Sequence, residues 1–373
     1  MARTRQLTLA RIASCAIALL ALIGVGLLAV DANAGSEQAS GLVAYVRYPG
    51  ENGGISVVPA AGGRSRSLTV RQGAPWYFSQ GAPPVWSPDG RWIAFIDSRN
   101  VPKSHDCLVD DDYACPSEIY AIRADGTGEH AITKPSDGTG HPVWSPDSSR
   151  LLYPRDGKLY LVNADGTGER RLTRNRPTFY ESSPSWSPDG REVAFAGAND
   201  IYVVRLDGSQ RRLTDSRVRR NGGPFFSPSW SPNGRWIAYV GYKPYHQGFT
   251  KLFLISPQGT DIRTITPRTR PLLDSFAWSP SGDRIAYDAG TEAHEQGMWV
   301  VDIATARHRR VIGVTGLQSW NDPSWSPSGD HLVLGFSISG NPHGCFVVNA
   351  DGGNEKRRLV LRGHSCAWQP ARR

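Results

Sequence analysis

The chain has 373 residues, of which 39% are hydrophobic and 20% are charged. This length exceeds one ordinary compact domain unless the chain forms a repeat or barrel architecture. The formal net charge of +8 is mildly basic, and binding of nucleic acid would need that charge concentrated in a stripe. We therefore expect no nucleic-acid partner.

Residues 1–34 have the features of a secretory signal peptide. A basic start leads into the apolar run 12–30, and the small residues Ala32 and Ala34 then suit cleavage before Gly35. The alternative is an uncleaved membrane anchor, because the apolar run approaches the length of a spanning helix. Cleavage would remove three arginines and one aspartate and lower the net charge from +8 to +6. We expect an exported protein, either periplasmic (or otherwise in the cell envelope) or secreted, which meets a membrane only through an uncleaved N-terminus.

A tryptophan motif recurs along the rest of the chain. It reads PSWSPDGREVAFAG at residues 184–197, and close copies begin at Pro84, Pro228 and Phe276. Its spacing of about 45 residues suits one four-stranded propeller blade. The seven anchoring tryptophans are Trp86, Trp144, Trp186, Trp230, Trp278, Trp325 and Trp368.

Each repeat divides into four expected strands. In the third copy these are residues 184–188, 192–196, 201–206 and 210–214. The SPDG turn follows the first strand, because proline presets its backbone angle and glycine closes it. The second and third strands are apolar and β-branched. The fourth carries an arginine pair, which fits an exposed sheet edge.

The strand count predicts an all-β protein, a β-propeller with seven four-stranded blades. The chain starts in mid-repeat, with strands at 42–46 and 55–59 ahead of the first anchor, and it ends on a lone tryptophan strand at 365–370. That C-terminal strand would join the N-terminal three strands in one blade and close the ring. A six-bladed ring with one displaced repeat is the alternative. The single propeller domain would span 42–370.

The repeat WSPDGxxIAF…IYVVxxDGxxxRRLT resembles the TolB-type, WD40-like β-propeller repeat over 42–370. The resemblance implies the propeller fold and a location in the cell envelope. Two features differ. TolB has an additional N-terminal α/β domain, for which this chain has no room, and the TolB propeller has six blades. The resemblance therefore does not imply the TolB role in binding a peptidoglycan-associated lipoprotein.

The repeated side chains have architectural and functional interpretations. Tryptophan is large and flat enough to fill the space between blades, which favours packing over ligand binding. The arginine pairs would protect the outer edges or form a basic girdle for an acidic partner. They are Arg170/Arg171, Arg211/Arg212, Arg309/Arg310 and Arg357/Arg358.

Loops of variable length share one face of the expected ring and are rich in aromatic residues. Such residues are enriched at recognition surfaces, although they would also pack on one another above the blades. The aromatic candidates are Trp76, Tyr77, Phe179, Tyr180, Tyr245 and Trp320. Polar candidates near the channel mouth, where strand capping is the alternative role, are His141, Glu181, Asp274, Asn321, Asp322 and His364.

Four cysteines follow residue 34, which suggests disulfides in an oxidising compartment. We expect Cys107 to pair with Cys115, and Cys345 with Cys366 is a second candidate pair. The first loop also holds four aspartates that could bind Ca²⁺, but their spacing does not match an EF-hand. We expect no metal and no other cofactor.

Catalytic motifs are absent from the sequence: we find no GxSxG, HExxH or P-loop, and no carboxylate pair stands out. The favoured hypothesis is a monomeric, non-enzymatic scaffold that binds a protein, peptide or glycan. The alternative is a metal-dependent hydrolase or lactonase-like enzyme with a cation held by Glu181, Asp274, Asn321 or Asp322. A sensor ectodomain is a third idea, favoured if the N-terminus stays uncleaved.

Overall fold

The computed structural model describes fourteen stretches of the chain. These are residues 41–47, 54–69, 83–98, 116–136, 138–174, 181–216, 224–243, 249–266, 275–289, 297–313, 318–338, 341–353, 356–360 and 363–371. Contacts divide the chain into Met1–Gln38 and Ala39–Arg373, and every described residue belongs to the second unit. The described residues include no helix that could cross a membrane. The expected signal peptide or anchor lies outside them.

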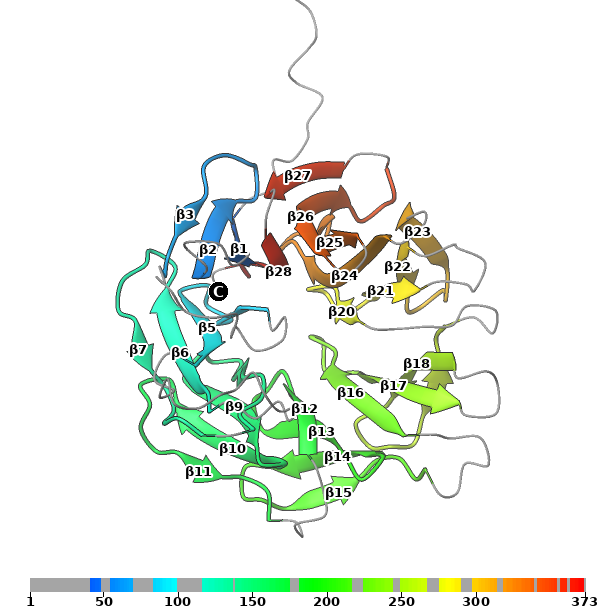
Figure 1. The fold of residues 1–373 in the computed structure, drawn as a ribbon. Helices are drawn as coiled ribbons and strands as arrows, with labels where there is room; N and C mark the ends of the chain where they lie inside the picture. Colours follow the sequence, from blue (N-terminus) through cyan, green and yellow to red (C-terminus); the bar gives the residue numbers. More distant parts are fainter. Residues whose placement is uncertain are drawn as a thin grey trace, which may run out of the picture. The chain divides into compact units, whose positions relative to one another are not determined.

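Seven four-stranded antiparallel sheets form a ring, which confirms the seven-bladed prediction over the six-bladed one (Figure 1). We number the blades along the chain and give each from its inner to its outer strand. Blade 1 contains β28 (Gly363–Trp368), β1 (Leu42–Arg47), β2 (Gly54–Pro59) and β3 (Arg66–Ser67). Blade 2 contains β4 (Val85–Trp86), β5 (Trp92–Asp97), β6 (Glu118–Arg123) and β7 (His130–Ala131). Blade 3 contains β8 (Val143–Trp144), β9 (Arg150–Arg155), β10 (Lys158–Asn163) and β11 (Arg170–Arg171).

The remaining four blades repeat this order. Blade 4 contains β12 (Glu181–Trp186), β13 (Glu192–Gly197), β14 (Asp200–Arg205) and β15 (Gln210–Arg212). Blade 5 contains β16 (Phe225–Trp230), β17 (Ile237–Lys243), β18 (Phe249–Ile255) and β19 (Ile262–Thr264). Blade 6 contains β20 (Phe276–Trp278), β21 (Arg284–Ala289), β22 (Gly297–Asp302) and β23 (His308–Gly313). Blade 7 contains β24 (Gln318–Trp325), β25 (His331–Ile338), β26 (Asn341–Asn349) and β27 (Lys356–Val360).

The first and last strands of the chain close the ring, as predicted. β28 pairs antiparallel with β1, with Val43 opposite Trp368 and Arg47 opposite Gly363. A disulfide joins Cys366 of β28 to Cys345 of β26, so the closing strand is also attached to blade 7. Of the two cysteine pairs considered, this is the second candidate. Cys107 and Cys115 lie outside the described residues.

The SPDG turn is held by its own side chains. In blade 4, Ser187 Oγ donates to Asp189 Oδ1 at 2.6 Å and accepts from the Glu192 amide at 2.9 Å. The Arg191 amide donates to the same Asp189 oxygen at 3.1 Å. Gly190 has a φ of 70°, in the left-handed region that favours glycine. These bonds fix the reversal from β12 to β13, so the motif is architectural.

The tryptophan that precedes this turn links neighbouring blades. All seven anchors are buried. Each described bond of this kind runs from the indole Nε1 to the carbonyl just before the previous anchor in the ring. The pairs, at 3.0–3.4 Å, are Trp86 to Ala367, Trp144 to Val85, Trp186 to Val143, Trp278 to Ser229, and Trp325 to Ala277.

The threonine of the RRLT motif links the fourth strand to the third. In blade 3, Thr173 Oγ1 accepts a hydrogen bond from the Leu159 amide at 3.1 Å, while Leu172 lies in the core. A buried threonine makes the same bond in each of the first five blades, at 2.9–3.2 Å. The threonines are Thr69, Thr133, Thr173, Thr214 and Thr266.

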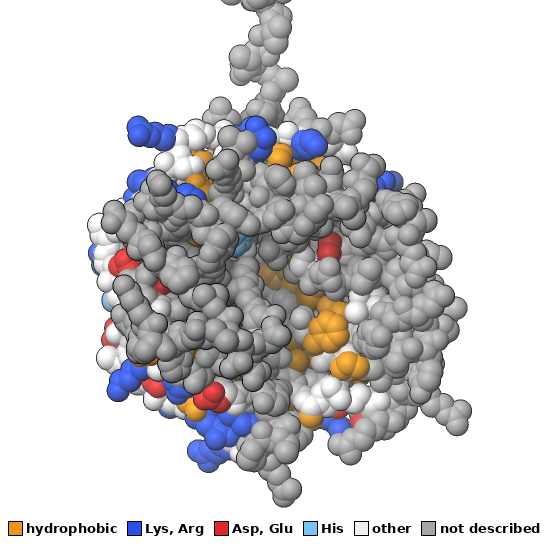
Figure 2. Space-filling model, in the orientation of Figure 1, with side chains coloured by type: hydrophobic (Ala, Val, Ile, Leu, Met, Phe, Trp, Pro, Cys, Tyr) orange, Lys and Arg blue, Asp and Glu red, His pale blue; other side chains and the backbone are white. Residues whose placement is uncertain are grey.

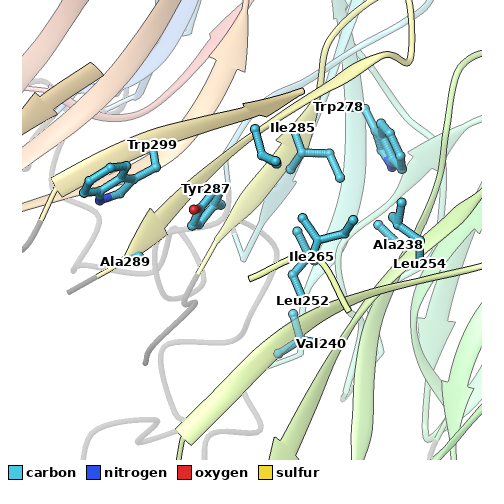
Figure 3. Packing of buried hydrophobic residues seen from close by; sticks show 11 residues of the cluster. Ala238, Val240, Leu252, Leu254, Ile265, Trp278, Ile285, Tyr287, Ala289 and Trp299 are labelled. Carbon is cyan, nitrogen blue, oxygen red and sulfur yellow. The ribbon is translucent and has the colours of Figure 1, made fainter. Parts of the chain in front are cut away.

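The hydrophobic core consists of clusters that each span two neighbouring blades. Figure 3 shows the cluster between blades 5 and 6, where Leu252 and Val240 lie opposite Trp278 and Ile285. A fully buried side chain of this size stabilises the fold by roughly 1.5–3 kcal/mol relative to exposure. Because every cluster of described residues spans two neighbouring blades, the ring is stabilised as a closed unit.

Outer-strand cations form a second set of links between blades. Arg170 donates to Leu206 O at 2.9 Å, and Arg211 donates to Pro257 O at 2.9 Å. Equivalent bonds to the next blade come from Arg66, His130, Arg309 and Arg357. The first arginine of each predicted pair therefore connects blades, a role beyond edge protection. In blade 5, Arg263 instead pairs with Asp261 at 2.9 Å and stacks on Trp236.

Candidate binding site at the channel mouth

The inner strands of the blades surround the central channel (Figure 1). Each inner strand ends on its tryptophan anchor, next to the SPDG-type turns, and we call that side the turn face. The opposite side, where the inner strands begin, is the mouth face. Figure 2 shows a hollow at the centre of the ring, with hydrophobic side chains on its wall and a histidine at its edge.

β-Bulges interrupt several inner strands near the mouth face. Ser183, Ser227 and Ser365 have φ angles of 51°, 51° and 52°, and each lies three residues before an anchor. The pairing register shifts at these points in β12, β16 and β28. Bulges reorient side chains and are frequent beside functional sites. Non-glycine residues in this φ region cost about 1–3 kcal/mol each, so their repetition here marks the mouth as a functional candidate.

Glu181 begins β12 and is 2% exposed. Its Oε2 accepts hydrogen bonds from the Leu159 amide at 3.2 Å and from Thr173 Oγ1, both in blade 3. Its own amide donates to Gly157 O at 3.1 Å. These bonds tie blade 4 to blade 3, so in this conformation the carboxylate is directed into the protein.

The two histidine candidates lie at the mouth-side ends of inner strands. His364 in β28 is half-buried, with Nδ1 2.9 Å from Ser365 Oγ, and burial lowers its pKa. His141 precedes β8 and is exposed, yet desolvation lowers its pKa as well. Both imidazoles are therefore neutral near pH 7 and can donate or accept hydrogen bonds.

Hydroxyl groups also occur near the mouth-side ends of two other inner strands. Ser182 and Ser183 of β12 are exposed, and Phe226 and Ser227 of β16 are half-buried. These hydroxyl groups and the exposed His141 lie at the mouth-side ends of inner strands, where they present hydrogen-bonding groups. This combination suits reversible binding of a polar ligand or a polypeptide segment.

Buried charges at the mouth-side ends of the second and third strands were missed by the sequence analysis. Asp97 and Glu118 are 4% and 5% exposed and lie directly opposite each other in the β5–β6 pair. Glu118 accepts a hydrogen bond from Tyr120 Oη at 2.6 Å. The only signal in the sequence was a charged residue at the end of each apolar strand. The pairing of Asp97 with Glu118 was not apparent, because a long connection separates the two residues in the sequence.

Asp200, at the start of β14, is a further buried carboxylate. It accepts hydrogen bonds from Thr214 Oγ1 at 2.8 Å and from the Ser216 amide at 2.8 Å. Arg212 lies 3.7 Å from its other oxygen. These partners come from the fourth strand and its continuation, so Asp200 holds the outer edge of blade 4 in place.

The aromatic part of the predicted surface stays a prediction. Trp76, Tyr77, Phe179, Tyr180, Tyr245 and Asp274 lie outside the described residues. Trp320, Asn321 and Asp322 fall within β24, but the description does not extend to their side chains. The described residues hold no group of three His, Cys, Asp or Glu side chains that could bind a metal ion. The acidic loop considered for Ca²⁺ is outside them too.

Comparison with known proteins supports the fold alone. No family model matches the chain, and no curated protein matches its sequence significantly. TolB from Acinetobacter baumannii is similar in structure, with a TM-score of 0.53, 15% identity, and coverage of 88% of this chain and 82% of that one. An oligogalacturonate lyase in complex with manganese gives a TM-score of 0.61, 15% identity, and coverage of 87% and 86%.

A third similar structure is the β-propeller domain of the Trilobed protease from Pyrococcus furiosus. It gives a TM-score of 0.59, 14% identity, and coverage of 87% of this chain and 93% of that domain. The chain therefore has a TolB-like β-propeller fold, as its repeat predicted. Propellers of this shape occur in proteins described as TolB, as a lyase and as part of a protease, so the fold does not select one activity.

Proposed function

We propose that the protein is an exported, non-enzymatic β-propeller that binds a protein, peptide or glycan at the mouth face. The observation that carries the proposal is that the polar groups at the mouth face fall into two sets with different roles. The carboxylates of Glu181 and Asp200 are directed into the protein, where they hold strands together. The exposed groups, Ser182, Ser183 and His141, are hydrogen-bonding groups on bulged or irregular backbone.

Export is supported by two features at opposite ends of the chain. The N-terminal 34 residues have the composition of a signal peptide. The disulfide between Cys345 and Cys366 suits an oxidising compartment. We propose a periplasmic, cell-envelope or secreted location on these grounds.

Site-specific photo-cross-linking in the native envelope tests the binding proposal. A photoreactive residue at exposed Ser182 samples the mouth face, and one at exposed Arg191 samples the turn face of the same blade. We expect Ser182 to capture a discrete partner that Arg191 does not. Equal capture at both positions, or none at Ser182, would contradict the proposal.

A metal-dependent enzyme is the second candidate. One support is the neutral state of His141 and His364, because neutral imidazole is the form that binds metal ions. The other is the buried pair of carboxyl groups, Asp97 and Glu118. The manganese complex of the similar lyase gives a parallel in fold only. Metal analysis of the purified protein, with Asp322→Ala beside the parent, separates the two: stoichiometric metal that is lost in the variant favours the enzyme.

A further inference from the structure

A small pocket opens on the turn face of blade 6, on the side opposite the channel mouth. Its volume is about 260 Å³, and we call it the blade 6 arginine pocket. Its lining residues are Arg284, Val300, Asp302, Thr305, Arg307 and Arg309. Three of these six residues carry guanidinium groups, and one carries a carboxylate.

Strand register explains why these side chains meet. Arg284 lies opposite Asp302 across the β21–β22 pair, and Val300 lies opposite Arg309 across the β22–β23 pair. Side chains two residues apart on a strand share a face, so these four residues lie on one face of the sheet. Val300 packs in the cluster that blade 6 forms with blade 7. The pocket therefore lies at the outer rim of the junction between these blades.

The one carboxylate in the pocket is already engaged. Asp302 Oδ1 accepts hydrogen bonds from the Thr305 amide and from Thr305 Oγ1, both at 2.8 Å. These bonds lower the pKa of Asp302, so the group is ionised at neutral pH. Within the described residues, no ion pair joins Asp302 to an arginine. The lining thus carries more positive than negative charge.

Two of the three arginines are held in place from behind. Arg284 donates to Gly329 O of blade 7 at 2.8 Å, and its guanidinium lies 5.0 Å from the centre of the Trp325 ring. Arg309 pairs with Asp351 of blade 7 at 2.8 Å and is half exposed. Such contacts fix the orientation of a guanidinium and reduce the entropy lost when it binds an anion.

The third arginine has no such partner. The side chain of Arg307 is exposed, and in the described part of the chain it makes no hydrogen bond or ion pair. Arg307 belongs to the hairpin between β22 and β23, which has the sequence DIATAR. In each of the other six blades the corresponding hairpin contains glycine, whereas here Ala306 adopts a φ of 53°. The hairpin that supplies the extra arginine is therefore unlike its repeats.

The equivalent position in blade 4 provides a comparison, because the charges there form ion pairs with one another. The position of Arg284 is occupied there by Glu192, and that of Asp302 by Arg205, in the same register. Glu192 pairs with Arg205 at 3.3 Å and with Arg211 at 3.0 Å. Blade 6 reverses this pair, with Arg284 opposite Asp302, and Arg284 also lies 3.8 Å from Asp283. What blade 6 adds is the exposed Arg307, whose side chain makes no ion pair within the described residues.

We propose that the blade 6 arginine pocket binds a small oxyanion, a phosphate or carboxylate group, between Arg284, Arg307 and Arg309. Guanidinium groups recognise both anions through paired N–H···O bonds. The cavity suits one such group and is smaller than the roughly 300–1,000 Å³ of typical small-molecule sites. This site lies on the other face from the proposed binding surface, and it stands independently of that function.

Titration calorimetry on the disulfide-intact protein tests the proposal. Inorganic phosphate and acetate are titrated separately, at constant ionic strength in chloride buffer. We expect saturable binding of at least one of them, with millimolar or stronger affinity. Stronger binding of phosphate identifies a phosphate site, and stronger binding of acetate identifies a carboxylate site. No heat above the chloride background for either anion would overturn the proposal.

Variants assign the binding to the pocket. Arg307→Ala should weaken binding at least tenfold, and Asp302→Asn should strengthen it because a repelling charge is removed. Arg91→Ala is the matched control, because Arg91 is 73% exposed on blade 2 and distant in sequence from the pocket. Equal affinity of Arg307→Ala and Arg91→Ala would overturn the proposal.

Chemical protection of the parent protein tests the site without any variant, so the result does not depend on whether a variant folds. Phenylglyoxal reacts with accessible arginines, and mass spectrometry measures the rate at each peptide. The anion that binds in calorimetry should slow the modification of Arg307 severalfold and leave Arg91 unchanged. Equal rates at Arg307 with and without the anion would place any binding elsewhere.

Discussion

The indole Nε1 of Trp144 donates a hydrogen bond of 3.0 Å to the carbonyl oxygen of Val85 in the preceding blade. The indole of Trp230 is equally buried, but its Nε1 has no hydrogen-bond partner within the described residues. The same repeat position thus occurs with and without the link between blades.

This difference predicts that the same substitution destabilises the two positions to different extents. Trp144→Phe should lower the free energy of unfolding by about 1–3 kcal/mol more than Trp230→Phe, because it alone removes the partner of a carbonyl. Both changes remove the same volume, so each is the control for the other. Denaturant unfolding measures the difference. Equal losses would show that packing, and not the hydrogen bond, explains the use of tryptophan.

Glu181 is predicted to stabilise the fold. Thr173→Val removes the hydroxyl that donates to Glu181 and should cost about 1.5–3 kcal/mol, since hydrogen bonds to charged groups are strong. Thr173→Ser keeps the hydroxyl and should retain most of that free energy, which denaturant unfolding would measure. If serine does not rescue stability, the buried methyl group of threonine is the important feature.

Glu181→Gln separates structure from partner binding. The amide keeps the shape of the side chain but lacks the charge that Thr173 Oγ1 and the Leu159 amide stabilise. We expect lower stability with unchanged photo-cross-linking at Ser182. Loss of cross-linking in a fully folded Glu181→Gln protein would instead assign Glu181 to the partner surface, as the sequence analysis had predicted.

The sequence predicted the fold well because its chemistry is local. The serine and aspartate of SPDG bond within five residues, as Ser187, Asp189 and Glu192 show. Six copies of the turn that follows the anchor, together with the seventh anchor Trp368, then determine the number of blades. Ring closure followed because the strand that ends at Trp368 had no partner nearby in the sequence.

The site was less predictable because it depends on partners far apart in the sequence. Glu181 looked like a surface residue, and its burial follows from bonds to Leu159 and Thr173 of another blade. The pairing of Asp97 with Glu118 crosses a 20-residue connection of irregular sequence. The blade 6 arginine pocket was not predictable either, because it depends on the register of three strands, which the sequence alone does not specify.

The disulfide between Cys345 and Cys366 is predicted to position the closing strand. It spans a sequence separation of 21 residues and joins β26 to β28, so β28 is attached covalently to blade 7 and by strand pairing to β1 of blade 1. Chain-entropy arguments give a stabilisation of about 3 kcal/mol for a loop of this size. The Cys345→Ala/Cys366→Ala variant should therefore lower Tm by several degrees.

Reductant provides the control for that measurement. It should lower the Tm of the parent toward that of the double variant and change the double variant much less. An unchanged Tm in the double variant would mean that hydrogen bonds and packing alone hold β28 in place.

Burial of His364 predicts a loss of stability in mild acid. Its pKa is lowered in the folded protein, so the unfolded chain binds its proton first as the pH falls. Folded stability should therefore be independent of this group above about pH 6.5, the usual histidine pKa, and should decrease below it. His364→Asn should remove part of the slope of unfolding free energy between about pH 6.5 and 5. His130→Asn, on the outer strand β7, is the comparison, and an identical slope in parent and His364→Asn would assign the acid sensitivity to other groups.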